Sequence, residues 1–371
     1  MTSSTITEIG RMLDYFGDEG CSDIHLSAQR GLWYVKDKST LAFEAMPTID
    51  QGIIDTLISE FAHGGLEAFE ANGQADSSFD IGGTFRGRLA VRKTVAGTTA
   101  TIRIISRRIP TSQELHLPDS LLDTIKRPAG LLLFTGQTGS GKSTSIAALV
   151  NDVNISEASS IYTIEDPVEY IYPVGRSLVN QREVGSHVRS FSEGVQNAKR
   201  SHPKIIVIGE IVNSETASAA VDAAASGHLV VSTMHAGSTA EAIDGLISMF
   251  PPNEQPLMRT LLSQVLLGVI VQTLIPKIGG GLAIAQEIAY NTRQFSEMVR
   301  GSGGEGGDMK LVQQYLLGGG RQERMVAMET SLTELVKSGT VLPETARAVA
   351  RDERVINDLL TTAGFPNTAK D

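Results

Sequence analysis

The chain has 371 residues, of which 41% are hydrophobic and 20% are charged, a composition typical of a globular protein with room for two domains. Its 32 basic and 42 acidic residues give a net charge of −10, which disfavours nucleic acid as a partner because phosphate binding requires Lys and Arg. The single cysteine, Cys21, excludes an internal disulfide and a CxxC zinc site and suits a reducing cytoplasm.

Neither a leader nor a membrane span is expected from the sequence. The first 20 residues carry acids and lack a continuous apolar core, so we expect no cleaved signal peptide. The apolar run VLLGVIV at 265–271 lies between Gln264 and Gln272 and is far shorter than the roughly 18 residues that a span requires. We therefore expect a cytoplasmic protein that crosses no bilayer by itself.

The first third of the chain predicts a mixed α+β domain. Residues 22–27, SDIHLS, alternate between polar and apolar side chains, as a half-buried strand does. Residues 53–62 have helical spacing, and residues 76–106 have the pattern of three short strands with glycine turns. Residues 107–120 carry two prolines and little periodicity, so a linker is expected there.

From about Leu121 the pattern changes to alternating strands and helices. Several strand candidates are apolar throughout, as buried parallel strands are. This predicts an α/β domain with a doubly covered sheet, followed by a helical tail. The strand candidates are residues 131–135, 160–165, 177–182, 205–210 and 228–235, and the tail helices are residues 258–274 and 325–339. The expected organisation is a first domain at 1–108, a linker at 109–120 and a second domain at 121–371.

The stretch GQTGSGKS at 136–143 matches the phosphate-loop pattern G-x-x-x-x-G-K-[ST]. Glycines let successive backbone N–H groups converge on a phosphate, and the following helix adds its N-terminal dipole. Lys142 would reach the β- and γ-phosphates, and the Ser143 hydroxyl would ligate Mg²⁺. The alternative is a chance glycine turn, which the strand before it and the helix after it disfavour. The predicted ATP-binding residues are Gly136, Gln137, Thr138, Gly139, Ser140, Gly141, Lys142, Ser143 and Thr144.

Hydrolysis also requires a group that positions or activates water near the γ-phosphate. Glu210 ends the apolar strand IIVIGE and is the candidate for this role, with a surface Glu after a strand as the alternative. Glu165 ends the strand candidate at 160–165 and Asp166 follows it, and paired acids there could hold Mg²⁺ through water, unless they form a solvated turn.

Two histidines, His228 and His235, flank the strand candidate HLVVSTMH seven residues apart. A lone His is more often structural than catalytic. Two at the ends of one apolar strand beside an ATP site could instead sense or stabilise phosphate. The residues alone leave both interpretations open.

Taken together and in this order, the motifs resemble the secretion ATPases of type II and type IV secretion and of type IV pili, with PilT-like and DotB-like members nearest in character. The resemblance covers most of the chain. Its motifs include SDIHLS, GQTGSGKSTSIAALV, YTIEDPVEY, LVNQREVG, IIVIGE and SGHLVVSTMHAGST. It implies a PAS-like N-terminal domain, a RecA-like ATPase core and a homo-hexamer with ATP between subunits, working on inner-membrane machinery. The net charge of −10 and the aromatic content of 5% give no reason to expect direct nucleic-acid binding.

The resemblance also assigns roles to matching residues. Glu210 corresponds to the glutamate that activates the attacking water, and Glu165 to an acidic-box glutamate near Mg²⁺. His228 and His235 correspond to the paired histidines of the His box. The family's N-terminal domain supplies arginines to the γ-phosphate, while ordinary solvated strand arginines are the alternative. The candidates are Arg88, Arg92 and Arg103.

Departures from the family pattern indicate which branch of the secretion ATPase family the chain resembles. Val212 and Asn213 replace the usual Arg-Asp pair, and residues 291–301 match the retraction-type segment poorly. A cysteine-rich zinc insertion, typical of pilus-assembly and type II ATPases, is absent from the sequence. We therefore expect a DotB-like ATPase of type IVB secretion or conjugation, peripheral at the inner membrane, with a PilT-like pilus retraction ATPase as the alternative. A nucleic-acid motor and a nucleotide-gated adaptor are the alternatives of another class.

Overall fold

The computed structural model describes residues 2–36, 39–62, 64–81, 83–301 and 309–366. The chain divides into two compact units, and each is treated by itself. Unit 1 comprises Met1–Ile109, Asp166–Pro173 and Glu183–His187. Unit 2 comprises Pro110–Glu165, Val174–Arg182 and Val188–Asp371. None of the helices in the described ranges combines the length and apolarity that crossing a bilayer requires.

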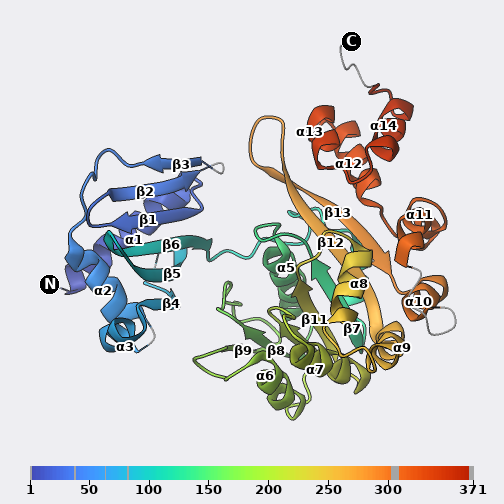
Figure 1. The fold of residues 1–371 in the computed structure, drawn as a ribbon, viewed down its shortest axis with the longest axis horizontal. Coiled ribbons are helices and arrows are strands. Elements are labelled where there is room, and N and C mark those ends of the chain that lie inside the picture. The colour runs from blue at the N-terminus through green and yellow to red at the C-terminus, as the bar shows by residue number, and fades with distance from the viewer. Residues whose placement is uncertain (1, 37–38, 63, 82, 302–308, 367–371) are drawn as a thin grey trace. The chain divides into compact units, whose positions relative to one another are not determined.

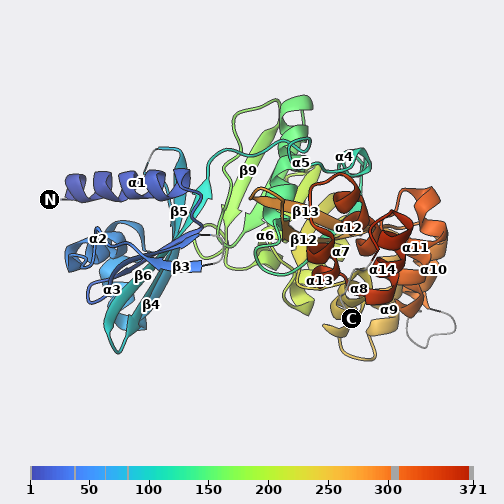
Figure 2. The same cartoon turned by 90° about the horizontal axis from the view of Figure 1, so that it is seen from above.

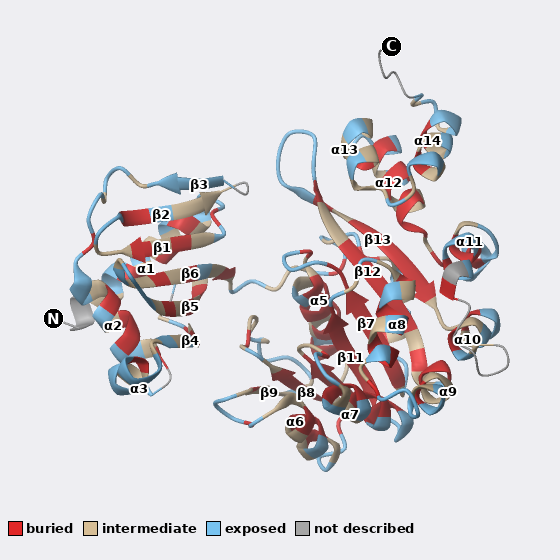
Figure 3. Ribbon diagram, in the orientation of Figure 1, coloured by how far each residue is buried: buried red, intermediate tan, exposed pale blue. Residues whose placement is uncertain are grey.

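Unit 1 is a six-stranded antiparallel sheet of order β3-β2-β1-β6-β5-β4 with three helices (Figure 1). The apolar side chains of alternating strand residues, such as Ile24, Leu89 and Ile102, are fully buried against α1 and α2 (Figure 3). The strands are β1 (Asp23–Ser27), β2 (Gly31–Lys36), β3 (Ser39–Ala42), β4 (Gln74–Phe79), β5 (Phe85–Thr94) and β6 (Gly97–Ser106), and the helices are α1 (Thr2–Asp18), α2 (Gln51–Phe61) and α3 (Gly65–Asn72).

Unit 2 is built on a seven-stranded sheet of order β13-β12-β7-β11-β10-β8-β9. Strands β12, β7, β11, β10 and β8 run parallel to one another, and β13 pairs antiparallel with β12. Every residue of β7, β10 and β11 is buried, as a parallel sheet covered by helices requires (Figure 3). The strands are β7 (Gly130–Thr135), β8 (Ser160–Glu165), β9 (Leu178–Glu183), β10 (Ile205–Ile208), β11 (Leu229–Met234), β12 (Leu266–Pro276) and β13 (Leu282–Tyr290).

Helices α5 to α8 pack against this sheet, and α12 to α14 pack together and onto β13 (Figures 1 and 2). Three of the sheet-covering helices begin at polar N-caps, where the side chains of Ser190, Asn213 and Ser238 each accept a backbone N–H of the first turn. The helices of unit 2 are α4 (Asp119–Ile125), α5 (Lys142–Ser156), α6 (Phe191–Lys199), α7 (Ser214–Ala225), α8 (Thr239–Ser248), α9 (Gln255–Val265), α10 (Arg293–Arg300), α11 (Val312–Leu317), α12 (Met328–Lys337), α13 (Pro343–Val349) and α14 (Glu353–Thr362), with 3-10 turns η1 (Met309–Leu311) and η2 (Gly319–Glu323).

The α/β class of unit 2 and the mixed α+β nature of unit 1 agree with the sequence predictions. The helix predicted over 258–274 is wrong in its second half, because α9 ends at Val265 and strand β12 begins at Leu266. The run contains the β-branched residues Val269, Ile270 and Val271, all buried beside β7. The sequence of a short apolar run does not distinguish a buried strand from a buried helix. Here the run forms a strand because it hydrogen-bonds to the side of β7 that β11 leaves unpaired.

Candidate active site

The glycine-rich segment connects the end of β7 to the start of α5 at the carboxyl edge of the parallel sheet. Gly136, Gly139 and Gly141 adopt φ angles of 143°, 77° and 84°, which side chains with a Cβ rarely tolerate. A Cβ on Gly136 would lie 2.3 Å from the carbonyl oxygen of Gln272. By contrast, a Cβ on Gly139 would meet no atom within 4 Å, so the outer side of the loop is open.

Lys142, the first residue of α5, lies inside this curl and is 8% exposed. Its Nζ donates to the carbonyl oxygens of Gly136 at 2.7 Å and Gln137 at 3.0 Å. The Ser140 hydroxyl is also buried and has no hydrogen-bond partner in the part of the chain that the structure describes. A buried cation, an unpaired hydroxyl and a helix N-terminus around an open glycine cradle fit a polyphosphate.

Gln272 of β12 supports the loop from the side of the sheet. This residue is 1% exposed, and its Nε2 donates to the Ser140 carbonyl at 3.0 Å. The Nε2 would also lie 3.0 Å from a Cβ on Gly141, so the side-chain amide lies against the last two residues before α5. In the sequence Gln272 stood out only as the polar residue that ends an apolar run.

Glu210 and His235 meet beside the loop because they follow two adjacent parallel strands, β10 and β11. The ends of these strands are joined by side-chain hydrogen bonds from Ser232 to the Ile208 carbonyl at 2.9 Å and from Thr233 to the Gly209 carbonyl at 2.6 Å. His235 Nε2 lies 2.8 Å from Glu210 Oε1.

The other ring nitrogen of His235, Nδ1, lies 3.3 Å from the carbonyl oxygen of Gly136 in the phosphate loop. Both ring nitrogens therefore face acceptors, and both donate at once only in the doubly protonated ring. The side chains of His235 and Glu210 are 52% and 32% exposed, so substrate and water have access to them. The imidazole thus bridges the candidate water-activating carboxylate and the phosphate loop.

Glu165 ends the strand on the other side of β10. Its Oε1 accepts hydrogen bonds from the Thr163 hydroxyl at 2.5 Å and from the Gln181 amide at 3.1 Å. A Cβ on Gly209 would lie 3.3 Å from the Glu165 Cα, so the absent side chain lets the two strand ends pass closely. Asp166, predicted with Glu165 as a metal ligand, is assigned to unit 1, and its role at the nucleotide stays a prediction.

His228 lies at the opposite end of β11 from His235. Leu229 pairs with Gly130 at the start of β7, whereas Met234 pairs with Thr135 next to the loop. The His228 side chain is buried, and its Nδ1 contacts the Ala223 carbonyl at 3.2 Å. The structure therefore separates the two histidines by the length of the strand and leaves the predicted catalytic role of His228 without a contact to the loop.

The candidate arginines all belong to unit 1. Arg92 forms a bidentate ion pair with Asp76 at 2.8 and 2.9 Å, and Arg103 contacts Asp23 at 3.1 Å. Arg88 pairs in register with Arg103 across β5 and β6. A role for any of them at the phosphate loop stays a prediction.

Metal binding at this site would depend on the nucleotide. No group of three or more His, Cys, Asp or Glu side chains among the described residues could hold a metal ion. Ser143 is exposed in the first turn of α5, where a hydroxyl can join phosphate oxygens and water around Mg²⁺. The residues present thus fit a magnesium ion carried in by the nucleotide.

The fold and the phosphate loop define a P-loop ATPase. Residues 79–338 match the family model described as type II/IV secretion system protein. The chain is 34% identical to the type IV pilus retraction ATPase PilT of Pseudomonas aeruginosa over 346 residues, covering 93% of this chain and 98% of that one. It is also 34% identical to a twitching motility protein of Neisseria gonorrhoeae over 286 residues, covering 76% of this chain and 75% of that one.

Among solved structures, the pilus retraction motor PilT with bound ADP superposes with a TM-score of 0.81 at 34% identity, covering 93% of this chain and 98% of that one. The DotB ATPase of Legionella pneumophila has a TM-score of 0.78 at 22% identity over 92% of this chain and 95% of that one, which shows the same fold. The chain belongs to the type II/IV secretion ATPase family.

Proposed function

We propose that this ATPase hydrolyses ATP at the carboxyl edge of the unit 2 sheet and that the energy drives a type IV pilus in the retraction direction. The observation that supports the chemistry is the contact of His235 with both Glu210 at 2.8 Å and the Gly136 carbonyl at 3.3 Å. It joins a carboxylate to the loop that would cradle the phosphates. A general base must lie within hydrogen-bond distance of the water that it deprotonates, and that water must lie next to the γ-phosphate.

In this proposal the backbone N–H groups of residues 136–144 and the Lys142 ammonium bind the phosphates. Lys142 would exchange the carbonyl oxygens of Gly136 and Gln137 for phosphate oxygens, and a contact between two opposite charges is stronger than one between an ammonium and a neutral carbonyl. Ser143 would hold Mg²⁺, with Glu165 and Asp166 acting through water, and the ion would neutralise the phosphate charge. Glu210 orients and activates the attacking water, and His235 holds that carboxylate in place.

The proposal extends to assembly. Six copies would form a ring at the cytoplasmic face of the inner membrane, and Arg88, Arg92 and Arg103 would approach the γ-phosphate across a subunit interface. Positioned arginines of this kind are worth about 10³ to 10⁵ in rate where they act. Arg92 and Arg103 would first have to leave their carboxylate partners Asp76 and Asp23.

The choice of machine differs from the sequence expectation, which ranked type IVB secretion first. Two relatives with pilus or twitching names reach 34% identity over 93% and 76% of this chain, whereas the DotB ATPases reach 22% and 19% and support the fold alone. The sequence argument had used the weak match of residues 291–301 to a retraction-type segment. Similarity across the whole chain carries more weight than that one segment.

The test is deletion of the gene in its host, with complementation by the wild-type protein or by Lys142→Ala. Loss of retraction should leave cells with more surface pili and no twitching, restored by the wild type and not by Lys142→Ala. Transfer of secreted protein or of conjugative DNA, assayed in parallel, should be unchanged. Normal twitching with lost transfer would instead support the type IVB alternative.

A further inference from the structure

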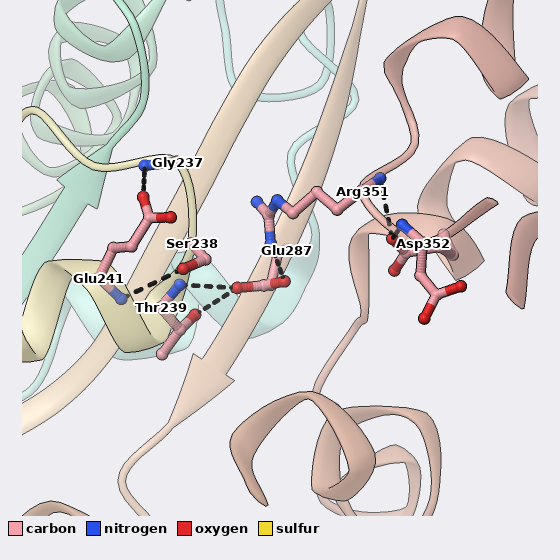
Figure 4. Close-up of polar contacts among 8 residues, drawn as sticks. Gly237, Ser238, Thr239, Glu241, Glu287, Arg351 and Asp352 are labelled. Carbon is pink, nitrogen blue, oxygen red and sulfur yellow. Dashed lines mark hydrogen bonds and ion pairs between the residues drawn. The ribbon is translucent and has the colours of Figure 1, made fainter. Parts of the chain in front are cut away.

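A buried carboxylate outside the phosphate loop connects two parts of unit 2. Glu287 lies on β13, and its side chain is 4% exposed. The Thr239 backbone N–H and hydroxyl donate to Glu287 Oε1 at 2.8 and 2.7 Å, and the Arg351 guanidinium donates to Oε2 at 2.5 Å (Figure 4). Burying a carboxylate is costly unless donors and a cation compensate it, and Glu287 has both.

The Thr239 side of Glu287 leads to the hydrolytic site. Thr239 is the first residue of α8 and follows His235 by four positions. The residues between them are held by two further hydrogen bonds, from Glu241 N–H to Ser238 Oγ at 3.1 Å and from Gly237 N–H to Glu241 Oε2 at 2.7 Å (Figure 4). Glu287 therefore fixes the point at which the short connection after His235 enters α8.

The Arg351 side of Glu287 leads to the C-terminal helices. Arg351 lies between α13 and α14, and its backbone N–H and that of Asp352 both donate to Glu329 Oε1 at 3.2 Å. Glu329 is on α12 and is 1% exposed. The Asp352 side chain in turn caps α14 by accepting the N–H groups of Arg354 and Val355. The turn at Arg351 and Asp352 thus ties α12, α13 and α14 to the carboxylate that holds Thr239.

We propose that Glu287 is a positioning residue for ATP hydrolysis. Through Thr239 it keeps His235 between Glu210 and the Gly136 carbonyl, and through Arg351 it makes this placement depend on the C-terminal helices. The inference rests on the proposed roles of Glu210 and His235. Glu287 touches none of the reacting atoms, so its effect is on the geometry of the imidazole. A misplacement of about 1 Å is enough to cost up to about 100-fold in rate.

The first test uses Thr239→Val, which removes one of the two hydrogen bonds to Glu287 Oε1 and keeps the backbone one. We expect kcat for ATP hydrolysis by the full-length chain to fall about tenfold, because a small displacement of His235 is sufficient. The Kd for a fluorescent ATP analogue with Mg²⁺ should stay unchanged, since the loop is untouched. Thr239→Ser keeps the hydroxyl and should restore kcat.

A matched control and a double variant separate positioning from general stability. Thr333→Val also removes a buried hydroxyl, one that bonds within α12 to the Glu329 carbonyl at 2.7 Å, and it should leave kcat unchanged. In a His235→Ala background, Thr239→Val should cause no further loss of kcat, because the imidazole that Thr239 positions is already absent.

The second test uses Arg351→Ala, which leaves the Glu287 carboxylate without its cation. It should lower kcat without changing the Kd for the ATP analogue, and Arg351→Lys should restore part of the loss. Two results would overturn the positioning role while Glu210→Gln still abolishes turnover and the site assignment stands. In the first, Thr239→Val and Arg351→Ala leave kcat unchanged. In the second, each lowers kcat by the same factor in the His235→Ala background as in the wild type. If Glu210→Gln turns over like the wild type, both are overturned.

Discussion

The two ends of strand β11 carry the same side chain in different surroundings. His235, at the end next to the phosphate loop, is half exposed and contacts a carboxylate and a loop carbonyl. His228, at the far end, is buried and its Nδ1 contacts the backbone carbonyl of Ala223 in the last turn of α7. In a parallel sheet the carboxyl ends of adjacent strands gather loops at one edge, and ligands bind there.

The difference shows that the spacing of residues in the sequence predicts which strand a residue flanks. Whether that residue can act on a nucleotide depends on whether it lies at the carboxyl or the amino ends of the parallel strands. Glu165, Glu210 and His235 follow three neighbouring strands at one edge. Tyr290 and Ser120 lie with His228 toward the other edge and form a hydrogen bond of 2.8 Å. Variants at the two ends of the parallel strands therefore test this difference.

The largest effect is expected for Lys142→Ala at the phosphate loop. Losing a charge-assisted contact costs about 1.5 to 3 kcal/mol, so the Kd for ATP with Mg²⁺ should rise roughly 10- to 150-fold and turnover should vanish. Isothermal titration calorimetry and phosphate release measure both. Lys126→Ala, an exposed lysine after α4, is the matched control and should bind ATP normally. Unchanged affinity in Lys142→Ala would contradict the assigned loop.

The paired histidine variants compare the two edges directly. His235→Ala should lower kcat about 100-fold with ATP binding retained, because the Glu210 carboxylate loses the group that orients it. His228→Ala should leave kcat unchanged and lower the free energy of unfolding by about 1 kcal/mol, the typical contribution of one hydrogen bond. Steady-state kinetics and urea unfolding measure these quantities. Equal losses of kcat in both variants would show that a histidine's position along β11 does not determine whether it contributes to hydrolysis.

The smallest effect is expected for Tyr290→Phe at the far edge. Burial raises the pKa of the Tyr290 hydroxyl above its usual value of 10.0. Below pH 10 the hydroxyl is protonated in both states, and its stabilising contribution is complete. Above pH 10 the unfolded chain releases the proton first, so the free energy of unfolding falls as the pH rises toward the folded-state pKa.

Urea unfolding between pH 7 and pH 11 tests this expectation. Tyr290→Phe should be less stable by about 1 kcal/mol at pH 7, because the bond to Ser120 is lost. Its stability should then decline less steeply than that of the wild type above pH 10. A decline remains, because burial also raises the pKa of Tyr315. Parallel curves for the two proteins would exclude a contribution from Tyr290.

The sequence predicted those parts of the molecule that local patterns encode. The glycine spacing around residues 136–141 predicted a strand, a loop and a helix, and the structure has β7 and α5 on either side of the loop. Apolar periodicity predicted most strands of unit 2. The same periodicity misassigned β12, because a buried strand and a buried helix present the same composition.

Contacts between distant residues could not be predicted in this way. Gln272 meets Ser140 from 132 positions away, and Glu287 meets Thr239 from 48 positions away. Neither belongs to a spacing motif, and each is a polar residue inside a largely apolar strand. Such residues are a usable signal, because a polar side chain inside a buried strand must find a partner. The identity of that partner depends on the order of the strands in the sheet.

The most direct test of the account compares Glu210→Gln with the wild type in single-turnover phosphate release and in equilibrium binding of ATP with Mg²⁺. The account predicts that Glu210→Gln binds ATP with wild-type affinity and that phosphate release slows by about 10² to 10⁴, the usual contribution of a general base. Release at the wild-type rate would contradict the central claim that Glu210 activates the attacking water at this edge of the sheet.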